Sequence, residues 1–303
     1  MRKLNVLSLF DGISCTQAAL QRSGVVINNY YASEVDKYAI QITNKNFPNT
    51  IQLGDVNNFS SWDLPKIDLI VAGFPCQAWS SAGKQKGLDD PRGQLAITTL
   101  EAWKYFNPRY FLFENVASMS KKNRQFMDDL FGVESIMINS ALVSAQNRKR
   151  LYWTNIPVNG QPMDENIALK DILEHGVVDR NKSYCIDANY FKGTNLNQYL
   201  KKCRRQVVFN YSSSGRGNGV VEDRFYESGL KKSHTITATG YTKRSFTGVY
   251  NNDNIRKLTP VECERLQTLP DNYTEGVSNT QRYKCLGNGF TVDVIAHILR
   301  GIK

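Results

Sequence analysis

The side chain best suited to covalent chemistry is Cys76, which lies in the segment Gly73-Phe74-Pro75-Cys76-Gln77. A cysteine thiolate is a strong nucleophile, so a thiol in this position favours covalent catalysis. The segment directly follows Ile67–Ala72, an apolar run that predicts a buried strand. The alternative is a structural cysteine buried in the core, which is the usual state of an unpaired thiol.

Four polar side chains stand at or just beyond the ends of predicted strands. Apolar, β-prone runs predict strands at Asn5–Phe10, Tyr30–Ser33, Ile67–Ala72 and Tyr110–Phe113. The four side chains are Asp11, Glu34, Cys76 and Glu114. Helical segments are expected up to Gly24 and over Gln94–Phe106. This alternation predicts an α/β fold with a mostly parallel sheet, where ligands bind outside the carboxyl ends of the strands. We therefore expect the four side chains to share one crevice.

The first of these strand ends has features of a nucleoside site. Phe10-Asp11-Gly12-Ile13-Ser14 is a glycine turn between a strand and a helix, which lets the backbone approach a ligand closely. The turn lacks the full G-x-G-x-x-G pattern and a phosphate-loop lysine, which disfavours a pyrophosphate cofactor, and an ordinary tight turn is the alternative. Glu34 is placed to accept hydrogen bonds from ribose hydroxyls, and Asp55, after Leu53-Gly54, to accept one from an adenine amino group.

The segment around Cys76 carries a resemblance to a known family. Gly73 to Gln77, continued through Trp79-Ser80, Gly83-Lys84, Gly87 and Asp90–Leu95, resembles the catalytic loop of cytosine-5 DNA methyltransferases. The resemblance implies that Cys76 adds to carbon 6 of a flipped-out cytosine, which makes carbon 5 nucleophilic enough to take a methyl group. It also implies a Rossmann-like methyltransferase fold and S-adenosylmethionine as the methyl donor, without a metal.

Two further elements match the family's catalytic pattern. Glu114-Asn115-Val116 matches its Glu-Asn-Val element, whose carboxyl group holds or donates a proton at ring nitrogen 3 of the cytosine. Gln146 to Arg150 is similar to its Gln-x-Arg-x-Arg element. The resemblance assigns binding of the cytosine carbonyl oxygen to Arg150, supported by Arg148. Taken alone, such a basic run is more often an exposed turn or a phosphate contact.

The resemblance also implies contacts to the cofactor and to DNA. The expected cofactor contacts are Phe10, Gly12, Ile13, Glu34, Asp55, Val56, Gly73, Pro75, Leu95 and Asn288. The expected DNA contacts are Gln77, Ser80, Lys84, Thr235 and Ile236, the last two in a short Thr-Ile match for which a plain β-strand is an equal alternative. Asn288 belongs to a Gly287–Phe290 block resembling the family's closing block. Arg256–Asp271 resembles the block before it, with a mostly structural role.

The chain departs from the family pattern at two places. Ser14 stands where many members have a second glycine, which affects the geometry of the first turn. Leu95 is followed by Ala96-Ile97, where phenylalanines are common. Neither position touches the reacting atoms, so we treat both as tolerated variation.

The change from regular, apolar segments to short, polar ones along the chain predicts two unequal lobes. Residues 1–156 are expected to form the catalytic and cofactor-binding domain, 157–255 a smaller, irregular, β-rich target recognition domain, and 256–303 a segment that returns to the first lobe. A capping signal at Thr259-Pro260 with Glu262, and a helix over Thr291–Leu299, mark the return of regular structure.

Composition limits the partners. The formal net charge of +10 favours a polyanionic partner, and the basic clusters within residues 157–255 fit phosphate contacts to double-stranded DNA. The six cysteines and three histidines show no metal-ligand spacing. Without a leader or a membrane-length apolar stretch, we expect a cytoplasmic protein with reduced thiols, in a bacterial or phage-infected cell. A monomer is expected, and a cognate restriction endonuclease is a candidate partner.

Two competing functions remain open from the sequence. An RNA cytosine methyltransferase of the same fold, acting on transfer RNA, would use the same chemistry. A non-catalytic DNA-binding relative would use the fold as a scaffold, but it would have no chemical need for a nucleophile facing an acid. The set Cys76, Glu114, Arg148 and Arg150 therefore favours an enzyme. The recognised DNA sequence and the preference for hemimethylated or unmethylated sites do not follow from the sequence.

Overall fold

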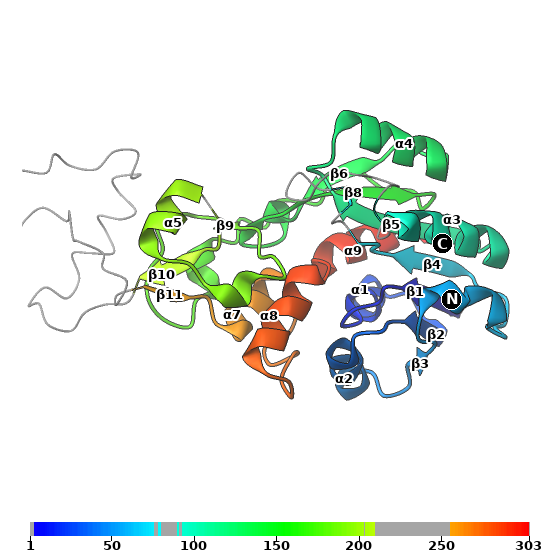
Figure 1. The fold of residues 1–303 in the computed structure, drawn as a ribbon, viewed down its shortest axis with the longest axis horizontal. Helices are drawn as coiled ribbons and strands as arrows, with labels where there is room; N and C mark the ends of the chain where they lie inside the picture. Colours follow the sequence, from blue (N-terminus) through cyan, green and yellow to red (C-terminus); the bar gives the residue numbers. More distant parts are fainter. Residues whose placement is uncertain are drawn as a thin grey trace, which may run out of the picture.

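A seven-stranded sheet forms the centre of the larger lobe (Figure 1). The computed structural model describes residues 3–75, 78–79, 90, 93–202, 204–209 and 255–302. The strands, in spatial order, are β3 (Ile51–Gln52), β2 (Ile27–Ser33), β1 (Leu4–Leu9), β4 (Leu69–Ala72), β5 (Tyr110–Val116), β8 (Lys149–Thr154) and β6 (Ile136–Asn139). The first five are parallel, and β8 runs antiparallel to both of its neighbours. The predicted mostly parallel α/β sheet is confirmed.

Alternate side chains of the central strands β2, β1, β4, β5 and β8 enter two separate hydrophobic clusters, one on each face of the sheet. On β1, Val6 belongs to one cluster and Leu7 to the other. Helices α1 (Cys15–Ser23), α2 (Lys37–Asn46) and α9 (Val292–Leu299) pack in the first cluster, while α3 (Gln94–Phe106) and α4 (Lys121–Phe131) pack in the second. Figure 1 shows α3 and α4 on one side of the strands and α1 and α2 on the other. Burial on both faces explains why these strands are apolar runs without alternation.

The smaller lobe, on the left of Figure 1, consists of short elements. They are η4 (Leu169–Ile172), β9 (Ser183–Tyr184), η5 (Tyr190–Lys192), α5 (Leu196–Lys202) and β10 (Val207–Phe209). β9 pairs with β7 (Gln146–Asn147) of the larger lobe, and β10 pairs with β11 (Ile255–Lys257). Several of these residues share the first hydrophobic cluster with α1 and α9, so the lobes are continuous in packing.

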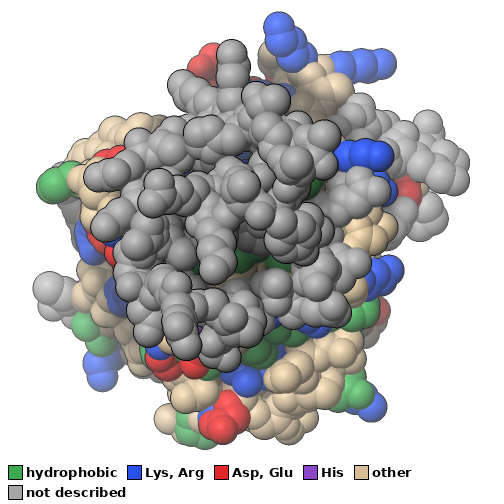
Figure 2. All heavy atoms as spheres, turned by 90° about the vertical axis from the view of Figure 1, so that its left-hand side faces the viewer, with side chains coloured by type: hydrophobic (Ala, Val, Ile, Leu, Met, Phe, Trp, Pro, Cys, Tyr) green, Lys and Arg blue, Asp and Glu red, His purple; other side chains and the backbone are tan. Residues whose placement is uncertain are grey.

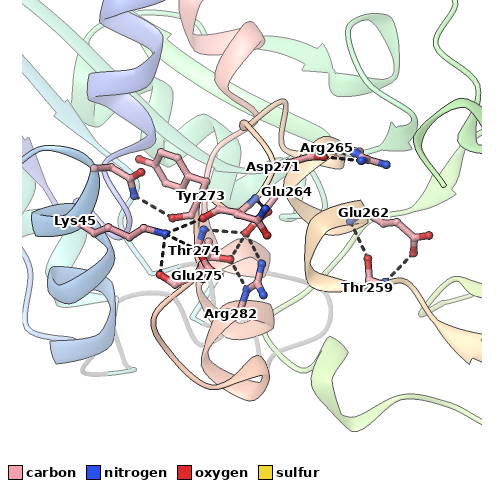
Figure 3. Close-up of polar contacts among 12 residues, drawn as sticks. Lys45, Thr259, Glu262, Glu264, Arg265, Asp271, Tyr273, Thr274, Glu275 and Arg282 are labelled. Carbon is pink, nitrogen blue, oxygen red and sulfur yellow. Dashed lines mark hydrogen bonds and ion pairs between the residues drawn. The ribbon is translucent and has the colours of Figure 1, made fainter. Parts of the chain in front are cut away.

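The return segment begins with the capping box that the sequence predicts. The Thr259 hydroxyl accepts from the Glu262 backbone N–H, and the Glu262 carboxylate accepts from the Thr259 N–H, at the start of α7 (Pro260–Leu266). Figure 3 shows this pair and, beside it, the fully buried Glu264, which accepts from the Arg282 guanidinium and the Thr274 backbone N–H. These contacts fix α7 against α8 (Asn279–Asn288), which supports the mostly structural role expected for this block.

The end of the strand that carries Glu114 differs from the prediction. The fourth strand was expected to end before Glu114, but β5 continues to Val116. The extension follows from pairing, because Glu114 lies opposite Tyr152 of β8 and Val116 opposite Arg150. Glu114 is therefore inside a strand, where the ladder fixes its direction. The helices over Gln94–Phe106 and from Thr291 form as predicted, with Thr291 as the residue before α9.

Candidate active site

A cavity of about 460 Å³ opens at the carboxyl edge of the parallel strands. β1 lies between β2 and β4, so the connection after β1 runs to one side of it and the connection after β3 crosses to the other side. At such a point in the strand order the loops diverge, and the crevice forms between them. Nine of the ten expected cofactor contacts line the cavity: Phe10, Gly12, Glu34, Asp55, Val56, Gly73, Pro75, Leu95 and Asn288. Glu114, Arg148 and Arg150 line it as well. The tenth, Ile13, does not line it, because its side chain is buried in the core beneath the turn.

The turn after β1 is held in shape by Glu34. Gly12 has a φ of +61°, a conformation that glycine adopts without strain. Its backbone N–H donates to Glu34 Oε2 at 2.8 Å, while Oε1 accepts from the N–H groups of Val35 and Asp36. Ser14 also has a positive φ, +57°, which accounts for glycine at this position in many family members. The carboxylate of Glu34 is thereby fixed at the rim of the cavity.

Asp11 is a cavity residue that the sequence placed at a strand end without assigning it a role. Its side chain accepts hydrogen bonds from the hydroxyl groups of Ser14 and Tyr30. Burial raises the pKa of Asp11 to about 6, against the lowering effect of these two hydroxyl groups. The cavity therefore contains a carboxyl group that changes charge close to neutral pH.

Asp55 lies in the turn after β3 and has its own support. It is the residue before η1 (Val56–Ser61), and its Oδ1 accepts from the backbone N–H of Asn57 at 2.9 Å. The side chain is exposed and lines the cavity. The preceding Gly54 has a φ of +77°. A glycine turn followed by a capping carboxylate accounts for the Leu53-Gly54-Asp55 signal in the sequence.

The opposite wall of the cavity comes from the return segment. Phe290 packs against Gly73 so closely that a Cβ on Gly73 would lie 2.7 Å from its ring. Lys284 of α8 forms a 2.6 Å ion pair with Asp36, which caps α2. No sequence signal pointed to Lys284 or Asp36, and Phe290 was named only as the last residue of the Gly287–Phe290 block, without a role. The resemblance had assigned only Asn288 here, and Asn288 is exposed at the end of α8.

Glu114 and Arg150 form an ion pair inside the cavity. The Nε of Arg150 lies 2.8 Å from Glu114 Oε1, and both side chains are mostly buried. Arg150 begins the antiparallel strand β8 at the level where β5 ends, so the strand pairing brings the two residues together. The two elements that the sequence likened to the family's acid and base-binding arginine are thus in direct contact.

Arg148 is held by the protein backbone. Its guanidinium donates to the carbonyl oxygens of Ile186 at 3.0 Å, Gly287 at 3.2 Å and Gly289 at 2.8 Å. The residue is 3% exposed. Because these carbonyls belong to the smaller lobe and the return segment, Arg148 joins three distant parts of the chain. Arg148 is therefore held more fully by the backbone than Arg150, whose Nε faces Glu114.

Several predicted residues lie outside the described part of the chain: Cys76, Gln77, Ser80, Lys84, Thr235 and Ile236. The described residues on either side of the catalytic loop do border the site, since Pro75 and Leu95 both line the cavity. Cys15, Cys263 and Cys285 are buried, as expected for structural cysteines.

The cavity suits S-adenosylmethionine in size and in donor set. Its volume lies within the range of about 300–1,000 Å³ usual for small-molecule sites. Glu34 and Asp55 supply acceptors for hydroxyl and amino groups, and the carboxyl group of Asp11 suits a cationic ligand. Among the described residues, no three His, Cys, Asp or Glu side chains gather as a metal site would require. Within the same residues, no helix is long and apolar enough to cross a membrane.

Comparisons with known proteins agree with this geometry. A family model described as "C-5 cytosine-specific DNA methylase" matches residues 4–303. The chain is 31% identical to Type II methyltransferase M1.ScrFI of Lactococcus lactis subsp. cremoris, covering 97% of this chain and 76% of that protein. It is 28% identical to Type II methyltransferase M.HhaI of Haemophilus parahaemolyticus, covering 99% and 94%. The crystal structure of a DNMT2 mutant from Spodoptera frugiperda shares the fold, with a TM-score of 0.65, 20% identity and 99% coverage of both chains.

Proposed function

The chain belongs to the C-5 cytosine-specific DNA methylase family, and we propose that its cavity binds S-adenosylmethionine at one end and a flipped cytosine at the other. It is a DNA cytosine-5 methyltransferase. The observation that carries the division into two ends is the Glu114–Arg150 ion pair, which faces the same cavity as Glu34 and Asp55. The acceptors Glu34 and Asp55 at one end suit a positively charged nucleoside. The Glu114–Arg150 pair at the other end suits a nucleobase.

The cofactor is bound by the strand ends in this proposal. Glu34, fixed by three backbone N–H groups, accepts from the ribose hydroxyls, and Asp55 accepts from the adenine amino group. Phe10, Val56 and Leu95 supply apolar surface. Gly12 and Gly73 let the backbone approach, and Asn288 closes the wall. When bound, S-adenosylmethionine supplies an electrophilic methyl group.

Cys76 is the nucleophile in this proposal. Its thiolate sulfur bonds to carbon 6 of the cytosine, and the ring electrons move to carbon 5, which then bonds to the methyl group as the bond between that methyl and the donor's sulfonium sulfur breaks and leaves a neutral thioether. A base removes the proton from carbon 5, the electrons return to the ring, and the bond between sulfur and carbon 6 breaks. The enzyme regains its thiol, and the net change is a methyl group in place of a proton.

Glu114 and Arg150 stabilise the charge that builds up on the ring. Glu114 holds a proton at nitrogen 3, opposite the atoms that react, so negative charge does not accumulate there. Arg150 donates to the carbonyl oxygen of the base and at the same time keeps the Glu114 carboxyl group oriented. Arg148 helps to hold the segment that carries Arg150 in place, through its contacts with three backbone carbonyls.

Duplex DNA is the proposed substrate, read by the interval 157–255. Figure 2 shows Lys and Arg side chains around the edge of the face that the smaller lobe presents. Such residues position a duplex through its phosphates, and Thr235 and Ile236 are proposed contacts to the DNA. Gln77, Ser80 and Lys84 are proposed to contact the nucleotide as it leaves the stack, because carbon 5 and carbon 6 are not accessible from both faces in a duplex.

A methyl-transfer assay with labelled S-adenosylmethionine tests the proposal. Duplex DNA and transfer RNA are compared, with Cys76→Ala as the matched control. We expect label in DNA, none in transfer RNA, and none with the variant, which should still bind S-adenosylmethionine. Label in RNA alone would reject the substrate, and near wild-type turnover by Cys76→Ala would reject the covalent route.

The cellular setting is proposed from the family. A restriction endonuclease acting on the same sequence is the proposed partner, the protein acts as a monomer, and the cytoplasm of a bacterial or phage-infected cell is the proposed location. Bisulfite sequencing of DNA from expressing cells reports both activity and target sequence.

A further inference from the structure

The smaller lobe places a cysteine beside both arginines of the active site. β9 pairs in parallel with β7, with Ser183 opposite Gln146 and Tyr184 opposite Asn147. Continuing this register by one residue brings Cys185 alongside Arg148. The main-chain pairing of β9 with β7 therefore places Cys185, the residue after β9, beside the segment Gln146 to Arg150.

The sulfur of Cys185 contacts both guanidinium groups. It lies 3.3 Å from Nη1 of Arg148 and 3.9 Å from Nη2 of Arg150. The same Arg150 side chain is 2.8 Å from Glu114 through its Nε. A continuous series of polar contacts thus runs from the smaller lobe through Arg150 to the proposed catalytic acid.

The charges of this cluster explain why a thiol suits the position. Arg148 and Arg150 bring two positive charges into a mostly buried space, and Glu114 brings one negative charge. Within the described residues, the guanidinium of Arg148 contacts carbonyl oxygens and this sulfur but no carboxylate. Burial raises the pKa of the Cys185 thiol, but the two guanidinium groups outweigh this effect, and the pKa is lowered from its ordinary value. The sulfur accepts from both guanidinium groups, while its S–H donates to the carbonyl oxygen of Ile186 at 3.4 Å.

We propose that Cys185 is a positioning residue for methyl transfer, whose sulfur holds the Arg150 guanidinium in the orientation that binds Glu114 and the cytosine. The inference rests on the proposed function of Arg150. Without the sulfur, Nη2 of Arg150 loses this contact and the guanidinium gains freedom to rotate away from the base. The chemistry then slows, whereas cofactor binding at the carboxylate end is unaffected.

Single-turnover methyl transfer to duplex DNA, measured together with affinities for S-adenosylmethionine and DNA, tests this role. We expect Cys185→Ala to lower the transfer rate by about tenfold, as loss of a hydrogen bond to a charged group does, and to change both affinities by less than about twofold. Cys185→Ser restores an acceptor at this position and should recover part of the rate. Tyr184→Phe, one residue earlier on β9, is the matched control and should keep the wild-type rate.

A double variant shows whether Cys185 acts through Arg150. If it does, Cys185→Ala combined with Arg150→Lys should be no slower than Arg150→Lys alone. Multiplied rate losses would overturn the proposal, as would a wild-type rate for Cys185→Ala. Thermal melting of each variant identifies unfolding, and in that case the folded Cys185→Ser variant decides by its rate. If the wild-type protein methylates no DNA, the proposed function and this inference are both rejected. If the wild-type protein methylates DNA at the same rate as Cys185→Ala, only the inference is rejected.

Discussion

The two ends of the cavity are built in different ways. At the carboxylate end, Glu34 directly follows β2 and Asp55 follows β3 by three residues, and backbone groups within two residues of them supply most of their support. At the arginine end, Arg148 is held by carbonyls of Ile186 and Gly287, which lie far away in the sequence. The sheet and the turns beside it therefore position the two carboxylates, and the return segment adds only the facing wall, whereas the position of Arg148 requires both the smaller lobe and the return segment to be docked. Each prediction below breaks one end while leaving the other intact.

The largest effect is expected from Glu114→Gln. The amide keeps the size of the side chain and can donate a hydrogen bond, but it has no acidic proton to share with nitrogen 3, so the methyl-transfer rate should fall by about 10²- to 10⁴-fold. S-adenosylmethionine affinity, measured by calorimetry, should stay within about twofold, because the carboxylate end is untouched. An equal loss in rate and in cofactor affinity would show that the two ends are not separable.

Arg148→Met should damage folding as well as catalysis. The substitution keeps a long side chain but removes three hydrogen bonds from the guanidinium to backbone carbonyls, at a cost of about 3 kcal/mol in the free energy of unfolding. Urea denaturation measures this loss. The matched variant Lys149→Met, on the neighbouring exposed residue, should leave the unfolding free energy within about 0.5 kcal/mol of wild type. Equal stability of the two variants would argue against Arg148 as the link between the three segments.

Two substitutions of Asp55 separate cofactor binding from helix capping. Asp55→Ala removes both the cap on Asn57 and the acceptor for adenine, whereas Asp55→Asn retains a capping oxygen. Both should weaken S-adenosylmethionine binding by about tenfold, but only Asp55→Ala should lower the unfolding free energy, by about 1 kcal/mol. Full affinity in Asp55→Asn would assign the residue to capping alone. Transfer rates at saturating cofactor should stay near wild type in both.

The smallest effect on catalysis is expected from Asp11→Asn, which instead changes the pH dependence of stability. Burial raises the pKa of Asp11 to about 6, so the folded state holds this proton at pH values where the unfolded chain has released it. The stabilising effect of the proton is fully present below about pH 4 and is lost as the pH rises through about 6. The stability of wild type relative to Asp11→Asn should therefore fall across this window and stay level above it, as measured by urea denaturation at each pH. A constant difference would contradict the buried carboxyl group.

The contrast between the two ends also explains what the sequence predicted. Glu34 and Asp55 were found because strand, turn and carboxylate are adjacent in the chain, so a local pattern determines their place. The family resemblance gave Glu114 and Arg150 separate roles but did not predict their contact, which depends on the long-range pairing of antiparallel β8 with β5. That pairing also extends β5 past Glu114, which the local pattern missed. Lys284 and Cys185 gave no signal, and Phe290 gave none beyond its place in the Gly287–Phe290 block, because each acts on a partner from another segment.

Covalent trapping on duplex DNA containing 5-fluorocytosine tests the central claim most directly. Fluorine replaces the proton that must leave carbon 5, so the protein should remain bonded to the DNA in the presence of S-adenosylmethionine, through position 76 when the adduct is digested and sequenced. Cys76→Ala should give no adduct. Absence of an adduct with a wild-type protein that methylates the unmodified duplex, or attachment through any other residue, would contradict the account.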